Sequence, residues 1–114
     1  MKPVSPAEFE GLVAEALDTL PPELASQFRN VAVVVEDENL DEPDLLGLYE
    51  GVPLTERSEY SGVLPDRISV YRIPLCLMAE DYDHLVEEVQ VTVVHEFAHH
   101  VGIDDERLHD LGWA

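Results

Sequence analysis

The sequence predicts an α+β fold in which a small mixed sheet of three to four strands packs on an N-terminal helix and a long second helix. Apolar residues recur at helical spacing near both ends of the chain, and short β-branched or alternating segments lie between them. At 114 residues, of which 46% are hydrophobic, the chain is long enough to bury one core. We therefore expect residues 1–114 to form a single domain that closes with a short helix.

The first helix is expected over residues 5–20. Residues 5–8 read S-P-A-E, the pattern of a capping box with proline at the first helical position. Six apolar residues then follow at helical spacing: Phe9, Leu12, Val13, Ala16, Leu17 and Leu20. Two prolines at residues 21–22 stop this helix, and a shorter helix is expected over residues 22–28.

Three short segments are predicted as strands. Residues 31–35 are a β-branched run, which is typical of a buried strand, and residues 45–50 are a second candidate that Gly47 interrupts. Residues 67–73 alternate between apolar and polar, so we expect a strand with one solvated face that ends at Pro74.

Two loops separate these strands. Residues 36–44 are acidic but lack the glycine and the ligand spacing of a calcium-binding loop, so a solvated loop is expected. Residues 51–66 are rich in glycine, proline, serine and charge, which predicts a long surface loop, and loops of this length are often functional.

The longest helix is predicted over residues 81–101, and a short helix over residues 105–111 precedes Gly112. The valines near residue 91 favour a strand locally, but the length and periodicity of the segment decide for a helix. The expected buried stripe consists of Val86, Val89, Val93, Phe97 and Val101. A second stripe, on a different face, consists of Glu88, Thr92, His95 and His99.

Residues 95–105 carry the most informative pattern, H-E-x-x-H-x-x-G-x-x-D. Side chains four residues apart lie one turn apart on the same helix face, so His95 and His99 can bind one metal ion. Catalytic zinc usually has three protein ligands and keeps one position open for water. Gly102 can end the helix and turn the chain back, so we predict a zinc site in which Asp105 is the third ligand.

Glu96 is the predicted catalytic residue, because it lies beside the two histidines and can handle a proton on a metal-bound water. The third ligand is less constrained than the histidines. Asp104, Glu106 and His109 compete with Asp105 for this role, and His109 could instead support Asp105 as a hydrogen-bond partner.

The remaining chemically active side chains are expected to be structural. We expect His100 to be packed or solvated and His84 to be solvated, and the lone Cys76 to be a buried thiol. Three tyrosines, each more typical of core or surface, are the candidates for an oxyanion donor: Tyr60, Tyr71 and Tyr82.

The metal motif resembles that of the zincin metallopeptidases, and its Gly-x-x-Asp extension is similar to the metzincin branch. Three more segments resemble a family of small bacterial zincin-like proteins: LGLYEG at residues 46–51, PDRI at 65–68 and HHVGIDDERLHDLGW at 99–113. The resemblance implies a minimal zincin-like α+β fold and a zinc-dependent peptidase, with Glu96 beside the fourth metal position. It implies no substrate. The chain departs from the metzincins because no methionine follows Asp105 to form a Met-turn.

The charge of the chain limits its partners. Asp and Glu total 25 against 6 Lys and Arg, a formal net charge of -19, which argues against binding nucleic acid or an anionic membrane surface. We expect a peptide or protein substrate, and a basic protein partner is compatible with this charge. Residues 1–5 lead into no apolar signal region, so a cytoplasmic location is expected.

Two alternatives to a peptidase remain open. The spacing H-x3-H-x5-D resembles the H-x3-H-x5-H of bacterial metalloproteins that mature ribosomal RNA, which would make the chain a non-peptidase metal hydrolase, although Glu96 and the charge argue against it. Alternatively, zinc only stabilises an acidic protein-interaction domain. An open fourth metal position indicates an enzyme, and a closed one a structural site. For a peptidase, residues 45–50 are expected to be an edge strand that pairs with an extended peptide.

Overall fold

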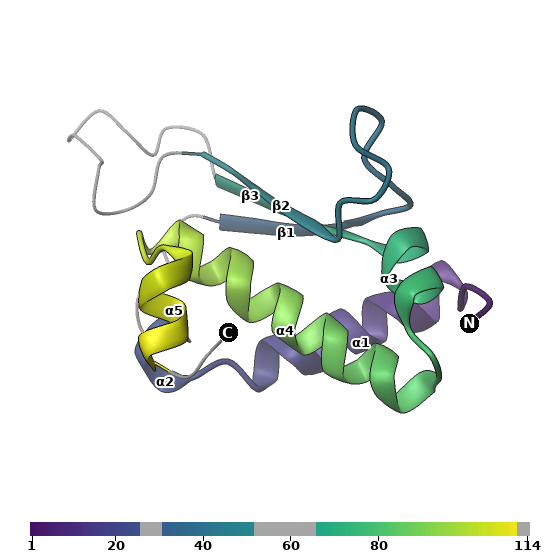
Figure 1. Ribbon diagram of the computed structural model, residues 1–114, viewed down its shortest axis with the longest axis horizontal. Coiled ribbons are helices and arrows are strands. Elements are labelled where there is room, and N and C mark those ends of the chain that lie inside the picture. Colours follow the sequence, from purple (N-terminus) through teal and green to yellow (C-terminus); the bar gives the residue numbers. More distant parts are fainter. Residues whose placement is uncertain (26–30, 52–65, 112–114) are drawn as a thin grey trace.

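A three-stranded mixed sheet covers one side of a layer of helices (Figure 1). The computed structural model describes residues 1–25, 31–51 and 66–111. The strands are β1 (Val31–Glu36), β2 (Gly47–Glu50) and β3 (Asp66–Tyr71), in the order β1-β3-β2. β1 is parallel to β3, and β2 is antiparallel to it. The predicted α+β class and the small mixed sheet are therefore confirmed.

The burial of the strands differs from the expectation. β3 is the central strand, and only Arg67 is exposed along it, so the prediction of one solvated face is wrong. β1 was expected to be buried but is mostly half-buried. The strand order explains both differences, because β3 has a neighbour on each side while β1 has one.

The end of β3 corrects a second expectation. The strand stops at Tyr71, and helix α3 (Arg72–Met78) begins directly after it. Proline lacks an N–H, but the first turn of a helix leaves its N–H groups unpaired in any case. Pro74 therefore sits within the first turn of a helix that the alternation had hidden, instead of ending a strand at residue 73.

The other helices follow the capping signals in the sequence. α1 (Pro6–Asp18) begins after Ser5, whose hydroxyl accepts a hydrogen bond from the Glu8 N–H at 3.2 Å. α2 (Pro22–Ala25) occupies the described part of the second predicted helix, and residues 26–28 lie outside the described residues. α4 (Tyr82–His100) and α5 (Asp105–Leu111) agree closely with the two predicted C-terminal helices. Gly112 and most of the predicted loop 51–66 also lie outside the described residues.

The main core lies between the sheet and the two long helices, α1 and α4 (Figure 1). The buried stripe of α4 is as predicted, except that Val86 is only partly buried. Cys76 is fully buried, as expected. A smaller cluster of Ala98, Val101 and Leu108 packs α5 against the end of α4. Among the described residues, no helix is long and apolar enough to cross a membrane.

Gly47 allows β2 to lie directly on α4, beside the metal motif. A Cβ atom at this position would lie 2.7 Å from Thr92 Cγ2 and 3.2 Å from Glu96 Cγ. Cβ contacts below about 3 Å require a neighbour to move, so only glycine fits without a shift. The glycine that interrupts the predicted strand is therefore what brings the edge strand against Glu96.

We expect Gly47→Ala to lower the free energy of unfolding by about 1–3 kcal/mol, as overpacking typically does. Thr92→Ser removes the clashing methyl group and should restore part of this loss in the double variant. Gly11→Ala is the matched control, because nothing lies within 4 Å of its added Cβ and alanine favours the helix. Urea unfolding measures all three, and equal stability of Gly47→Ala and the parent would contradict the close packing.

Candidate metal centre

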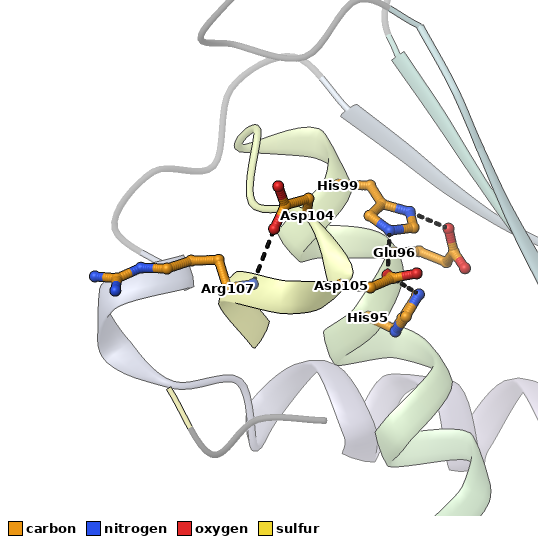
Figure 2. Close-up of polar contacts among 6 residues, drawn as sticks. All are labelled: His95, Glu96, His99, Asp104, Asp105 and Arg107. Atoms are coloured by element: carbon orange, nitrogen blue, oxygen red, sulfur yellow. Dashed lines mark hydrogen bonds and ion pairs between the residues drawn. The ribbon is translucent and has the colours of Figure 1, made fainter. Parts of the chain in front are cut away.

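Two imidazoles at the end of α4 converge on one carboxylate of α5 (Figure 2). Asp105 Oδ1 lies 3.0 Å from His95 Nε2 and 3.1 Å from His99 Nε2. The two histidine rings meet edge to face, with centroids 4.5 Å apart. The i, i+4 spacing thus brings the side chains together as the helix geometry requires, with the same nitrogen of each ring facing Asp105.

A tight turn carries Asp105 back to the histidines. Gly102 has a φ of 87°, a conformation that side-chain-bearing residues rarely adopt, and its N–H donates to His99 O at 3.0 Å. The Ile103 N–H donates to Ala98 O at 2.8 Å, which satisfies another carbonyl at the helix end. Leu108 then anchors α5 in the small apolar cluster. The role expected of Gly102 in ending the helix is therefore confirmed.

The donor set fits a zinc ion. Two imidazole nitrogens and a carboxylate oxygen are ordinary zinc ligands, with bonds of about 2.0–2.2 Å. Donors arranged tetrahedrally around such bonds lie roughly 3.3 Å apart, close to the distances from Asp105 Oδ1 to the two Nε2 atoms. Ligand atoms of His95, Glu96 and His99 also come within 4.8 Å of one another, so a metal could alternatively engage Glu96. The convergence of both Nε2 atoms on Asp105 favours Asp105 as the third ligand, with the Glu96 carboxylate beside the three donors.

Glu96 is almost fully buried, with 7% of its surface exposed, although it belongs to the metal motif. Its Oε1 lies 3.2 Å from His99 Nδ1, while His99 Nε2 faces Asp105. The Glu96 carboxylate raises the pKa of His99 above its ordinary value, Asp105 adds to this effect, and partial burial opposes it. Conversely, the two imidazoles, His99 first, lower the pKa of Asp105. The two carboxylates therefore favour the protonated form of His99 more than the surroundings of an ordinary histidine do.

We expect zinc uptake near pH 7 to release a proton from His99. Because its pKa is raised, a larger fraction of this ring is protonated at neutral pH than of an ordinary histidine, and zinc binds the neutral form. As the pH is lowered, zinc affinity should therefore begin to fall at a higher pH than in a site whose histidine ligand has an ordinary pKa. Titration calorimetry in two buffers of different ionisation enthalpy counts the protons. Glu96→Gln removes the largest cause of the shift and should release fewer, so equal release by both proteins would contradict the assignment.

The residues that compete with Asp105 lie just before α5 or further along it. The Asp104 carboxylate accepts a hydrogen bond from the Arg107 N–H at 2.8 Å, as a helix cap does, and is turned away from the histidines (Figure 2). Glu106 and His109 are exposed, and within the described residues no hydrogen bond joins either to the two histidines. The geometry thus favours Asp105 over its three competitors.

The structure also shows the surroundings of the other histidines and tyrosines that the sequence analysis considered. His100 is fully buried and bonded to Asp66, a polar role that the sequence did not suggest. His84 is half-buried instead of freely solvated, since its Nδ1 accepts a hydrogen bond from the Glu80 N–H at 3.0 Å. Tyr71 is buried and accepts a hydrogen bond from Asn39, and Tyr82 is exposed at the start of α4. Tyr60 lies outside the described residues.

A groove of about 350 Å³ adjoins His95 and Glu96. Residues 44–47, which lead into β2, line one side, and the same face of α4 that carries His95 lines the other. The lining includes the carboxylates of Asp44 and Glu88 and no Lys or Arg among the described residues. Substrate-sized space is therefore present next to the candidate centre.

This H-E-x-x-H helix beneath a mixed sheet defines a protein with a metal-dependent peptidase-like fold. The model of the zincin-like metallopeptidase family matches residues 28–113, and the chain belongs to this family. It is also similar to the solved structure of a conserved hypothetical protein from Thermus thermophilus, with 27% identity and a TM-score of 0.57. That similarity covers 95% of this chain and 97% of the other. No curated protein matches the chain significantly.

Proposed function

We propose that this chain is a zinc-dependent peptidase in which His95, His99 and Asp105 hold the metal and Glu96 is the general base. The observation that carries the proposal is the convergence of both Nε2 atoms on Asp105 Oδ1, directly beside the buried Glu96 carboxylate. Membership of the zincin-like family supports the same interpretation.

A bound zinc ion would supply Lewis acidity, which lowers the pKa of a water molecule and polarises a peptide carbonyl. Glu96 takes one proton from the attacking water while the water oxygen bonds to the carbonyl carbon. Glu96 then passes this proton to the leaving nitrogen as the C–N bond breaks. Glu96 gains one proton in the first step and loses the same proton in the second, so its carboxylate is ionised again at the end of the cycle. Burial against β2 keeps Glu96 near the groove during both transfers.

β2 gives the substrate a place to bind. It is an edge strand of the described sheet, as expected for residues 45–50, and its first residue, Gly47, lines the groove together with the three residues before it. An extended peptide can add to such an edge through main-chain hydrogen bonds, which fixes its direction relative to the metal. The peptide bond to be cleaved would then lie across the end of the groove at His95 and Glu96.

The charge of the groove predicts the substrate class. With Asp44 and Glu88 at its walls, and a net charge of -19 on the chain, we expect peptides with Lys or Arg near the scissile bond to be cleaved best. The double variant Asp44→Asn, Glu88→Gln should lose this preference by up to about fivefold per carboxylate, as expected for partly exposed ion pairs. A library of matched basic, neutral and acidic peptides measures it, and a preference for acidic peptides would contradict the assignment.

The same library tests the proposed activity itself. Zinc-loaded protein should cleave a subset of the peptides, and protein treated with a chelator should cleave none until zinc is restored. If zinc binds stoichiometrically and no peptide is cleaved, the zinc-stabilised interaction domain is favoured over the peptidase.

A further inference from the structure

A buried polar network lies one residue beyond the candidate metal ligand His99. Asp66 Oδ2 accepts two hydrogen bonds, from Tyr49 Oη at 2.6 Å and from His100 Nδ1 at 2.8 Å. His100 is fully buried and Asp66 is 5% exposed. The three side chains come from β2, β3 and α4, so the network joins the central strand to the edge strand and to the metal-bearing helix.

The chemistry of the network fixes the direction of its bonds. A carboxylate can only accept, so His100 Nδ1 carries the hydrogen in this contact. His100 Nε2 is buried and, among the described residues, has no hydrogen-bond partner, so the bond to Asp66 is the polar contact that orients the ring. Tyr49 and Phe97 contact the same ring edge to face, with centroids 5.9 and 6.4 Å away. The His100 ring is therefore held by one hydrogen bond to Asp66 and is packed between two aromatic side chains.

A glycine makes room for the acceptor of this bond. Gly51 has a φ of 152°, and a Cβ atom there would lie 2.4 Å from Asp66 Oδ1. The backbone at Gly51, the residue after β2, thus passes close to the Asp66 carboxylate. The Gly51 backbone and the His100 side chain approach Asp66 from the edge strand and from the metal-bearing helix.

We propose that Asp66 and His100 are positioning residues for the metal centre. Their bond holds the last turn of α4 against the sheet, at the point where the chain leaves the helix to bring Asp105 back. His99 precedes His100, and Gly102 and Ile103 bond to the same turn, so displacement of this turn moves His99 and Asp105 relative to His95. The inference rests on the proposed metal site.

The test compares zinc dissociation constants, measured by competition with a chromogenic chelator, for variants shown to be folded by circular dichroism. His100→Phe keeps an aromatic ring and removes the donor, and it should weaken zinc binding by about tenfold, the lower end of the range for partners of metal ligands. His100→Asn places an amide donor near the Nδ1 position and should restore most of the affinity. His84→Phe makes the same change at the other end of α4 and should leave zinc binding unchanged.

A second pair of variants keeps the test decisive if His100→Phe does not fold. Asn places its amide near the Nδ1 position and Gln near the Nε2 position, so His100→Asn should bind zinc about tenfold more tightly than His100→Gln. Wild-type affinity in folded His100→Phe, or equal affinities of the Asn and Gln variants, would overturn the positioning role alone. A parent protein that binds no zinc would overturn the proposed metal site as well.

Discussion

Replacing Glu96 by glutamine is expected to abolish peptide hydrolysis while the fold and the bound zinc remain. Glutamine nearly matches glutamate in size, so the buried position beneath β2 can accept it. Its amide cannot take a proton from the attacking water, and general base catalysis contributes about 10²–10⁴-fold to such reactions. We therefore expect kcat to fall by at least about a hundredfold, with the zinc content unchanged.

The matched control for this variant is Glu87→Gln, which makes the same substitution at an exposed position of α4. Its cleavage rate should equal that of the parent, measured on a peptide selected from the library. Cleavage that survives in zinc-loaded Glu96→Gln at the parental rate would show that the general base is another group.

The second large effect concerns the third metal ligand. Asp105→Ala is expected to weaken zinc binding by tens-fold or more, because it removes the oxygen on which both imidazoles converge. Asp104→Ala removes only the cap of α5, which costs about 1 kcal/mol of helix stability, and His109→Ala removes an exposed side chain. Both should therefore bind zinc more tightly than Asp105→Ala does.

Competition with a chelator of known affinity measures these three constants side by side. A greater loss in His109→Ala than in Asp105→Ala would reassign the third ligand to His109. The double variant His95→Ala, His99→Ala provides the reference for a destroyed site, and full zinc binding by this variant would place the metal elsewhere in the chain.

Local signals in the sequence predict the two long helices, α1 and α4, although α3 was missed. The Ser5 cap and the Gly102 turn each act within a few residues, so the start of α1 and the end of α4 follow from the sequence. The strands depend on neighbours that are distant in sequence. The alternation at residues 67–71 could not show that β3 is central, and Pro74 is equally compatible with the end of a strand and the first turn of a helix.

In the candidate site, too, the features set by local sequence could be predicted and those set by long-range packing could not. The approach of His95 and His99 follows from helix geometry, and that of Asp105 from a glycine turn at a fixed spacing. The bond from His100 to Asp66 spans 34 positions and depends on how α4 packs on the sheet, which no local pattern encodes. One signal was present, however. Tyr49 and Asp66 lie in the two segments outside the metal motif that resemble the zincin-like family.

X-ray absorption at the zinc edge of the loaded protein tests the central claim most directly, because it reports the ligands around the metal. We predict two imidazole nitrogens at about 2.0–2.1 Å and oxygen ligands at about 2.0–2.2 Å, from one carboxylate and one water. In Asp105→Ala the imidazole signal should persist while the oxygen shell changes. A spectrum with fewer than two imidazoles, or with four protein ligands and no water, would contradict an open catalytic centre built from His95, His99 and Asp105.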